Sequence, residues 1–146
     1  MSREKSITEA FSFKIDSLTR KMRRYAFTQL KQQGIDITVD QWGALGLLYE
    51  QEKPISQREL AERLIKDAPT TSRILDILHK KRYLERKPVE NDRRKFNLIL
   101  TKEGKHIVES IKPIVSQIRE NIFEGLSEKD FEQLDRLISK ILKNVE

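Results

Sequence analysis

The amino-acid sequence predicts a mainly α-helical fold with one small β-hairpin. Three observations support this prediction. Apolar residues recur every three or four positions through long segments at both ends of the chain, which is the period of an amphipathic helix. Five stretches place a Ser, Thr or Asp just before such a segment, as helix starts do. One stretch near residues 95–101 alternates apolar and polar residues, which is typical of a half-buried strand.

The first two helices are predicted from an apolar stripe and a capping signature. The first helix runs to about Gly34, and its stripe consists of Ile7, Phe11, Ile15, Leu18, Met22, Ala26 and Leu30. In "ITVDQW", Thr38 stands as the N-cap of the next helix and Gln41 as its capping-box partner. The second helix is therefore expected at about residues 39–50.

The third and fourth helices are short and follow each other closely. Ser56 and Glu59 form the same capping signature, so a helix is expected to start at Gln57. Asp67 caps the fourth helix, and Pro69 falls in its first turn, where a missing backbone N–H costs least. Two helices joined by so short a link predict a helix-turn-helix.

The fourth helix has two different faces when its residues are spaced at 100° intervals. The inward face consists of Thr71, Ile74, Leu75 and Leu78. The outward face is polar and partly cationic, and it consists of Pro69, Ser72, Arg73, Asp76 and Lys80.

A hairpin and two further helices complete the chain. The stretches "YLERKPV" (83–89) and "KFNLILT" (95–101) are expected to be two strands, because the second alternates regularly and Pro88 suits a strand edge. Thr101 caps a helix that reaches about Ile122, with a kink predicted at Pro113. The last helix starts after Ser127 and has its apolar stripe at Phe131, Leu134, Ile138, Ile141 and Val145. This order predicts a winged helix-turn-helix between long helices.

Length and composition exclude several classes of protein. The 146 residues predict one domain, and 37% hydrophobic content is enough to form a core. No apolar run is long enough to span a membrane and the first residues lack a signal sequence, so a cytoplasmic protein without a membrane partner is expected. There is no cysteine, and His79 and His106 are the only histidines, so neither a metal site nor a cofactor is expected. No acid/base constellation or glycine-rich phosphate loop indicates an enzyme.

The positive charge is concentrated in one third of the chain. Residues 58–105 contain 14 Lys and Arg against 8 Asp and Glu, a difference of +6 that equals the net charge of the whole chain. A basic segment in an otherwise neutral chain favours a polyanion partner, since neutralised phosphates release counterions. A solvated basic face is the alternative.

The charge and the helix-turn-helix together predict double-stranded DNA as the partner. The fourth helix would enter the major groove, with Pro69, Thr70, Ser72 and Arg73 at base edges or nearby phosphates. The hairpin would reach the minor groove with Arg93, Arg94 and Lys95, while Asp92 holds one guanidinium in place. In the alternatives, Arg73 only pairs with Asp76, and Asp92 only forms a turn.

Four blocks of the sequence resemble the MarR family of bacterial transcription regulators, named for multiple antibiotic resistance. They are "TVDQWGALGLL" (38–48), "SQRELAERL" (56–64), "DAPTTSRILDIL" (67–78) and the wing. The family's wing signature is Asp, any residue, Arg and a spacer leading to Leu-Thr, and it is matched by Asp92, Arg94, Leu100 and Thr101. One departure is Arg82, which stands where the family usually has a glycine in a left-handed conformation.

The resemblance implies one domain, 1–146, that forms an obligate homodimer. Residues 1–34 and 102–146 would supply N- and C-terminal dimerisation helices, and 35–101 the DNA-binding lobe. The interface would contain Phe11, Ile15, Leu18, Leu134, Ile138 and Ile141. The resemblance also implies a pseudo-palindromic operator, bound usually by a repressor that a small-molecule effector releases.

Some alternatives stay open at the level of the sequence. Phe13, Tyr25 and Trp42 are candidates for lining an effector pocket, with core packing as the other role for each. A winged helix used only for protein contacts would need a neutral or acidic helix and wing, contrary to the charge distribution. Nonspecific architectural binding to DNA or RNA is harder to separate, because phosphate contacts carry no sequence information.

Overall fold

The computed structural model describes residues 3–146, with side chains from residue 6 onward. Within this range the chain forms six helices and one three-stranded antiparallel sheet, which confirms the predicted mainly α fold. In chain order the elements are α1 (Arg3–Gln32), α2 (Val39–Glu50), β1 (Ile55–Ser56), α3 (Gln57–Leu64), α4 (Ala68–Lys80), β2 (Leu84–Val89), β3 (Asp92–Leu100), α5 (Lys102–Ile122) and α6 (Glu128–Lys143).

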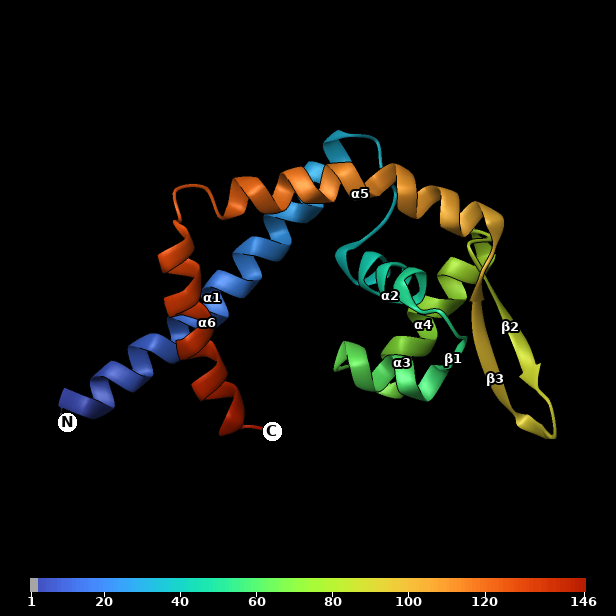
Figure 1. Ribbon diagram of the computed structural model, residues 1–146, viewed down its shortest axis with the longest axis horizontal. Coiled ribbons are helices and arrows are strands. Elements are labelled where there is room, and N and C mark those ends of the chain that lie inside the picture. Colours follow the sequence, from blue (N-terminus) through green and yellow to red (C-terminus); the bar gives the residue numbers. More distant parts are fainter. Residues whose placement is uncertain (1–2) are drawn as a thin grey trace.

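The molecule has two distinct ends joined by α5 (Figure 1). Helices α2, α3 and α4 pack with the sheet into a lobe at one end. Helix α5 leads away from this lobe and packs against α1, and α6 follows at the other end. The core lies inside the lobe and under α5, and the side chains of Leu45, Leu60, Leu75, Leu78 and Val108 are fully buried in it. The first and last helices therefore extend away from the lobe.

The predicted capping residues start the helices. Complete capping boxes open α2 and α6. At α3 only half of the predicted box forms: the Ser56 hydroxyl accepts from the backbone N–H of Glu59 at 3.1 Å. The Glu59 carboxylate instead accepts from Arg63 at 3.0 Å, because that guanidinium lies one turn further along the same face.

The sheet contains one strand more than the predicted hairpin. Strand β1 pairs Ile55 with Leu98 and Ser56 with Asn97, so the strand order is β1-β3-β2. Strand β1 has no signal in the sequence, because two residues show no alternation and one of them also caps α3. Strand β3 starts at Asp92, three residues earlier than predicted, and the two-residue turn before it places Asn91 at a φ of 70°.

Two exposed turns of the lobe hold large residues in the left-handed backbone region. Arg82 has a φ of 64°, the left-handed conformation that the sequence predicted at the end of the fourth helix. Ile65, at the end of α3, has a φ of 54°, and its side chain is 91% exposed. A β-branched residue is disfavoured there, since its side chain crowds the backbone. Both turns flank α4, so the helix is positioned by two strained connections.

A close approach fixes the start of α5 against the hairpin. Thr101 caps α5, accepting from the backbone N–H of Gly104 at 2.9 Å, and its hydroxyl donates to the carbonyl of Arg82 at 2.6 Å. A Cβ on Gly104 would lie 2.0 Å from the carbonyl oxygen of Tyr83. Glycine is therefore required at position 104, where the backbones of α5 and the hairpin meet.

Candidate nucleic-acid interface

The first turn of α4 is fixed by a charged cap. Asp67 accepts from the backbone N–H of Thr70 at 2.7 Å. This hydrogen bond is the main reason that the pKa of Asp67 lies below its usual value. The buried hydroxyl of Thr71 donates to the carbonyl of Asp67 at 2.9 Å, which anchors the same turn to the inside of the lobe.

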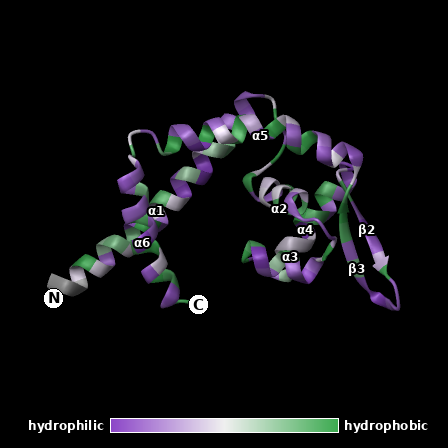
Figure 2. Cartoon of the chain, in the orientation of Figure 1, coloured by the Kyte–Doolittle hydropathy of each residue, from purple (hydrophilic) through white to green (hydrophobic). Residues whose placement is uncertain are grey.

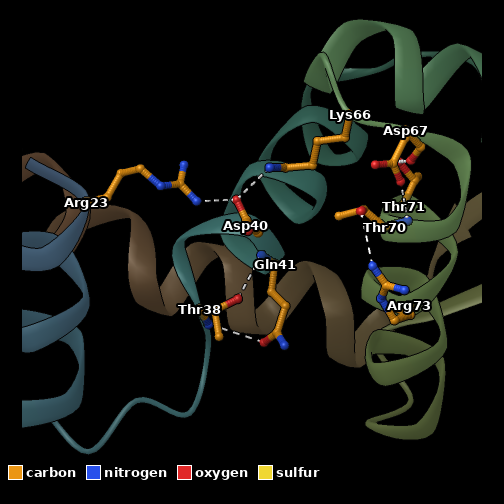
Figure 3. Close-up of polar contacts among 9 residues, drawn as sticks. All are labelled: Arg23, Thr38, Asp40, Gln41, Lys66, Asp67, Thr70, Thr71 and Arg73. Carbon is orange, nitrogen blue, oxygen red and sulfur yellow. Dashed lines mark hydrogen bonds and ion pairs between the residues drawn. The ribbon is translucent and has the colours of Figure 1, made fainter. Parts of the chain in front are cut away.

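The outer face of α4 presents the residues that the sequence assigned to it. Pro69 and Arg73 are exposed, and Thr70 and Ser72 are half-buried. The Arg73 guanidinium donates to the hydroxyl of Thr70 at 3.2 Å (Figure 3). The side chains at the start of α4 are therefore linked to each other by a neutral hydrogen bond, and the guanidinium keeps its charge available.

Asp76 pairs with the hairpin and not with Arg73. Its carboxylate accepts from the guanidinium of Arg86 in β2 at 2.8 Å. The alternative in which Arg73 is only the partner of Asp76 therefore does not describe this structure. The pair also ties the hairpin to the helix, a role for Arg86 that the sequence analysis missed. Strand alternation was a usable signal, because Arg86 lies two residues from the buried Leu84 and so shares its face.

The three cations of the wing lie where the hairpin ladder is interrupted. Pro88 and Val89 are consecutive in β2, yet they lie opposite Phe96 and Asp92 of β3. The residues between, Arg93, Arg94 and Lys95, therefore have no opposite residue in β2. Such bulges re-aim side chains away from the regular pleat. All three side chains are exposed, and the tip of the hairpin is hydrophilic (Figure 2).

These wing cations have no acidic partner within the described part of the chain. None of the ion pairs among residues 6–146 includes Arg93, Arg94 or Lys95. Asp92 accepts from the backbone N–H of Arg94 at 3.0 Å, and not from a guanidinium as predicted. The short side chain turns back onto its own turn, as Asp residues in turns do, so the turn-forming alternative holds.

Only one of the three candidate pocket residues lines a pocket between the long helices and the lobe. A cavity of about 210 Å³ lies between α1, α2 and α5. Its lining consists of Met22, Arg23, Ala26, Leu30, Val39, Trp42, Val115, Ile118, Arg119 and Ile122. Neither Phe13 nor Tyr25 is among these lining residues. Phe13 is 76% exposed, and the Tyr25 hydroxyl accepts from Asn121 at 3.3 Å.

The six residues predicted at a dimer interface are all exposed in the single chain. They are Phe11, Ile15, Leu18, Leu134, Ile138 and Ile141. No residue of α6 is buried, although hydrophobic residues recur along the helix (Figure 2). The apolar stripe of α6 therefore does not fill a core within one chain.

The described residues contain neither a metal-binding cluster nor a helix that could span a membrane. Among the described residues there is no group of three or more His, Asp or Glu arranged to hold a metal ion. His79 and His106 are exposed and lie on different helices. No helix in residues 3–146 combines the length and apolar character needed to cross a bilayer.

The lobe defines the chain as a winged helix-turn-helix protein, and comparison with known proteins shows which family it resembles. The model of the MarR family matches residues 35–95. The chain is 29% identical to MepR of Staphylococcus aureus, solved as a complex with DNA, over 92% of this chain and 97% of that chain, with a TM-score of 0.84.

Two further solved structures of MarR proteins are also similar to this chain. A mutant of MarR from E. coli complexed with operator DNA is 25% identical over 97% of this chain and 99% of that one, with a TM-score of 0.82. A MarR transcriptional regulator from Methanosarcina mazei Go1 is 26% identical over 93% of this chain and 96% of that one, with a TM-score of 0.78. The chain is therefore similar to the MarR family in sequence over residues 35–95 and in fold over most of its length, and the solved structures that it matches include transcriptional regulators.

Proposed function

We propose that this chain is a MarR family regulator, a homodimeric repressor that binds a pseudo-palindromic operator in double-stranded DNA. The observation that carries the proposal is the set of unpaired cations at one end of the lobe. Arg73 on α4 and Arg93, Arg94 and Lys95 on the wing are exposed, and none of them forms an ion pair among the described residues. Cations left unpaired in this way are free to neutralise phosphates. Two of the similar structures are complexes with DNA.

Each element of the lobe has a separate role in this proposal. Helix α4 enters the major groove, where Pro69, Thr70, Ser72 and Arg73 meet base edges or nearby phosphates. The bulged wing reaches the backbone and the adjacent minor groove, where narrow A·T-rich tracts attract arginine. The Arg86–Asp76 pair holds the wing and the helix at a fixed separation, which supports simultaneous contact with both grooves.

Dimerisation through 1–34 and 102–146 is supported by the surface of the single chain. The chain exposes 11667 Å². A compact monomer of 17.3 kDa is expected to expose about 7,800 Å². The excess is large enough to accommodate an obligate homodimer interface, which typically buries upwards of about 2,000 Å² in total. Phe11, Ile15 and Leu18 on α1 and Leu134, Ile138 and Ile141 on α6 supply apolar side chains for it.

Release by a small-molecule effector is the remaining part of the proposal. The cavity beside Trp42 has an apolar lining and the side chains of Arg23 and Arg119 among its residues. A small apolar molecule fits that chemistry, because the Trp42 ring and the aliphatic side chains of the lining can bury it. Phe13 and Tyr25 are not part of this pocket within one chain.

The competing function is nonspecific architectural binding to DNA or RNA. Both functions predict steep salt dependence, so salt alone does not separate them. Selection of bound duplexes from a random DNA pool at near-physiological salt does separate them. The proposal predicts an inverted repeat with half-sites about one helical turn, roughly 10 base pairs, apart. Recovery of duplexes without a common motif would contradict it, and tighter binding to RNA than to any selected duplex would favour the alternative.

A further inference from the structure

A carboxylate on α2 connects three segments that are distant in the sequence. Asp40 Oδ1 lies 2.5 Å from a guanidinium nitrogen of Arg23 and 3.0 Å from Nζ of Lys66 (Figure 3). Arg23 belongs to α1, and Lys66 lies in the three-residue connection between α3 and α4. One oxygen atom therefore joins a long outer helix to the turn of the helix-turn-helix.

The environment of the cluster makes these contacts stronger than ordinary surface pairs. The exposed fractions of the three side chains are 47% for Arg23, 33% for Asp40 and 23% for Lys66. Partial burial acts to raise the pKa of Asp40, but hydrogen bonds and charge from both cations outweigh it, and the pKa is lowered. The carboxylate is therefore charged at neutral pH, and both contacts are maintained.

Lys66 lies directly before the residue that starts α4. The next residue, Asp67, caps α4. The residue before Lys66 is Ile65, whose left-handed backbone is disfavoured and needs support from its surroundings. The ion pair between Asp40 and Lys66 therefore restrains the start of α4. The ion pair between Asp40 and Arg23 connects the same carboxylate to α1.

We propose that Asp40 is a positioning residue that fixes α4, the recognition helix, relative to α1. It thereby sets the half-site separation that the dimer accepts. The inference rests on the proposed function, because it needs a dimer joined through α1 and α6 and an operator with two half-sites. In such a dimer the distance between the two copies of α4 depends on the angle between each lobe and its own α1. A carboxylate that ties both elements limits this angle.

The test compares operators of different spacing. The selected inverted repeat is prepared with its natural separation and with one base pair removed or added, and dissociation constants are measured for wild type and Asp40→Asn. The expected result is that Asp40→Asn binds the natural spacing within a few-fold of wild type. Its preference for that spacing over the altered ones should fall by roughly three- to tenfold, the scale of one or two partly exposed ion pairs.

Two further variants make the result specific to this cluster. Arg23→Met keeps the aliphatic packing of the side chain and removes only the ion pair with Asp40, and it lies outside the proposed DNA contacts, so it should relax the spacing preference in the same way. Glu50→Gln is the matched control, because Glu50 is also on α2 and bridges to another helix, pairing with Lys112 of α5 at 3.1 Å. It should leave the preference unchanged.

Several outcomes would overturn the proposal. An unchanged ratio of affinities in Asp40→Asn would do so, including the case where a freed Lys66 strengthens binding to all three spacings equally. An equal loss on all three spacings would indicate general damage to the lobe. A relaxed spacing preference in Glu50→Gln would show that the effect is not specific to Asp40. If the wild-type protein selects no inverted repeat, the proposed function itself is wrong. If the wild-type protein selects one and Asp40→Asn keeps the same spacing preference, only the role of Asp40 is wrong.

Discussion

Replacing Arg94 with alanine tests the wing most directly, because the structure predicts a loss of DNA binding without a loss of stability. The Arg94 side chain is exposed and makes no ion pair within the described residues. The turn hydrogen bond to Asp92 uses the backbone N–H of Arg94, which alanine retains. The free energy of unfolding should therefore change by less than about 0.5 kcal/mol, as for other surface substitutions.

The effect on binding can be estimated from the chemistry of one arginine contact. Operator binding should weaken by roughly 1 to 3 kcal/mol, the range of one good arginine contact. The dimer carries two copies, so if both contact phosphates the slope of log K against log salt should become shallower by about 1.8, at about 0.9 per contact. Fluorescence anisotropy over a series of salt concentrations measures both quantities.

A matched variant controls for the change in net charge. Arg20→Ala removes the same charge from α1, where the side chain is 79% exposed and pairs with Asp16 within one helix. It should alter neither the affinity nor the slope by a comparable amount. If Arg94→Ala and Arg20→Ala behave alike, the wing assignment is refuted and only the overall charge of the protein matters. Unchanged binding by Arg94→Ala would remove this residue from the interface.

The remaining predictions concern the scaffold. Gly104→Ala should lower the free energy of unfolding by roughly 1 to 3 kcal/mol in urea denaturation, because its Cβ meets the backbone of Tyr83; equal stability would refute the close approach. Arg82→Gly should raise stability by about 1 kcal/mol, since it relieves a left-handed arginine; a loss would indicate an unrecognised contact of that side chain. Ile138→Glu should yield monomers in sedimentation velocity, and a persistent dimer would exclude α6 from the interface. The folded pKa of Asp67 is lowered, so its stabilising contribution is present above pH about 4 and is lost as the pH falls through that folded value. The stability difference between wild type and Asp67→Asn should therefore shrink on acidification, and a constant difference would contradict a charged cap.

The sequence predicted the elements whose signals are local. The N-caps at Thr38, Ser56 and Asp67 were identified because a capping side chain and its target lie within three residues of each other. The buried face of α4 followed from the helical period alone, and Thr71 and Leu75 are fully buried as expected. Each of these features depends on a few neighbouring residues, so each is visible in one sequence.

The features that the sequence did not reveal depend on contacts between distant segments. Strand β1 exists because Ile55 meets Leu98, more than forty positions away. Asp92 was assigned to a guanidinium because both groups are charged, but its own backbone turn offers a nearer donor. Phe13 was grouped with Trp42 only because both are aromatic. Phe13 lies more than two helical turns before Met22, the first residue of α1 that lines the pocket with Trp42.

The same distinction explains why candidates for DNA contact are easier to find in the sequence than residues that position them. Arg93, Arg94 and Lys95 stand out in the sequence because no acidic residue in the described part of the chain pairs with them, so their charge remains visible as an excess. Asp40 pairs with Arg23 and Lys66, which lie 17 and 26 positions away along the chain, so no local count of charge reveals the cluster. A residue that acts on DNA must stay unpaired, whereas a residue that fixes the geometry of the lobe must be paired. Charge counting therefore finds the first kind and hides the second, and only the folded structure identifies Asp40 as the connection between α1 and the recognition helix.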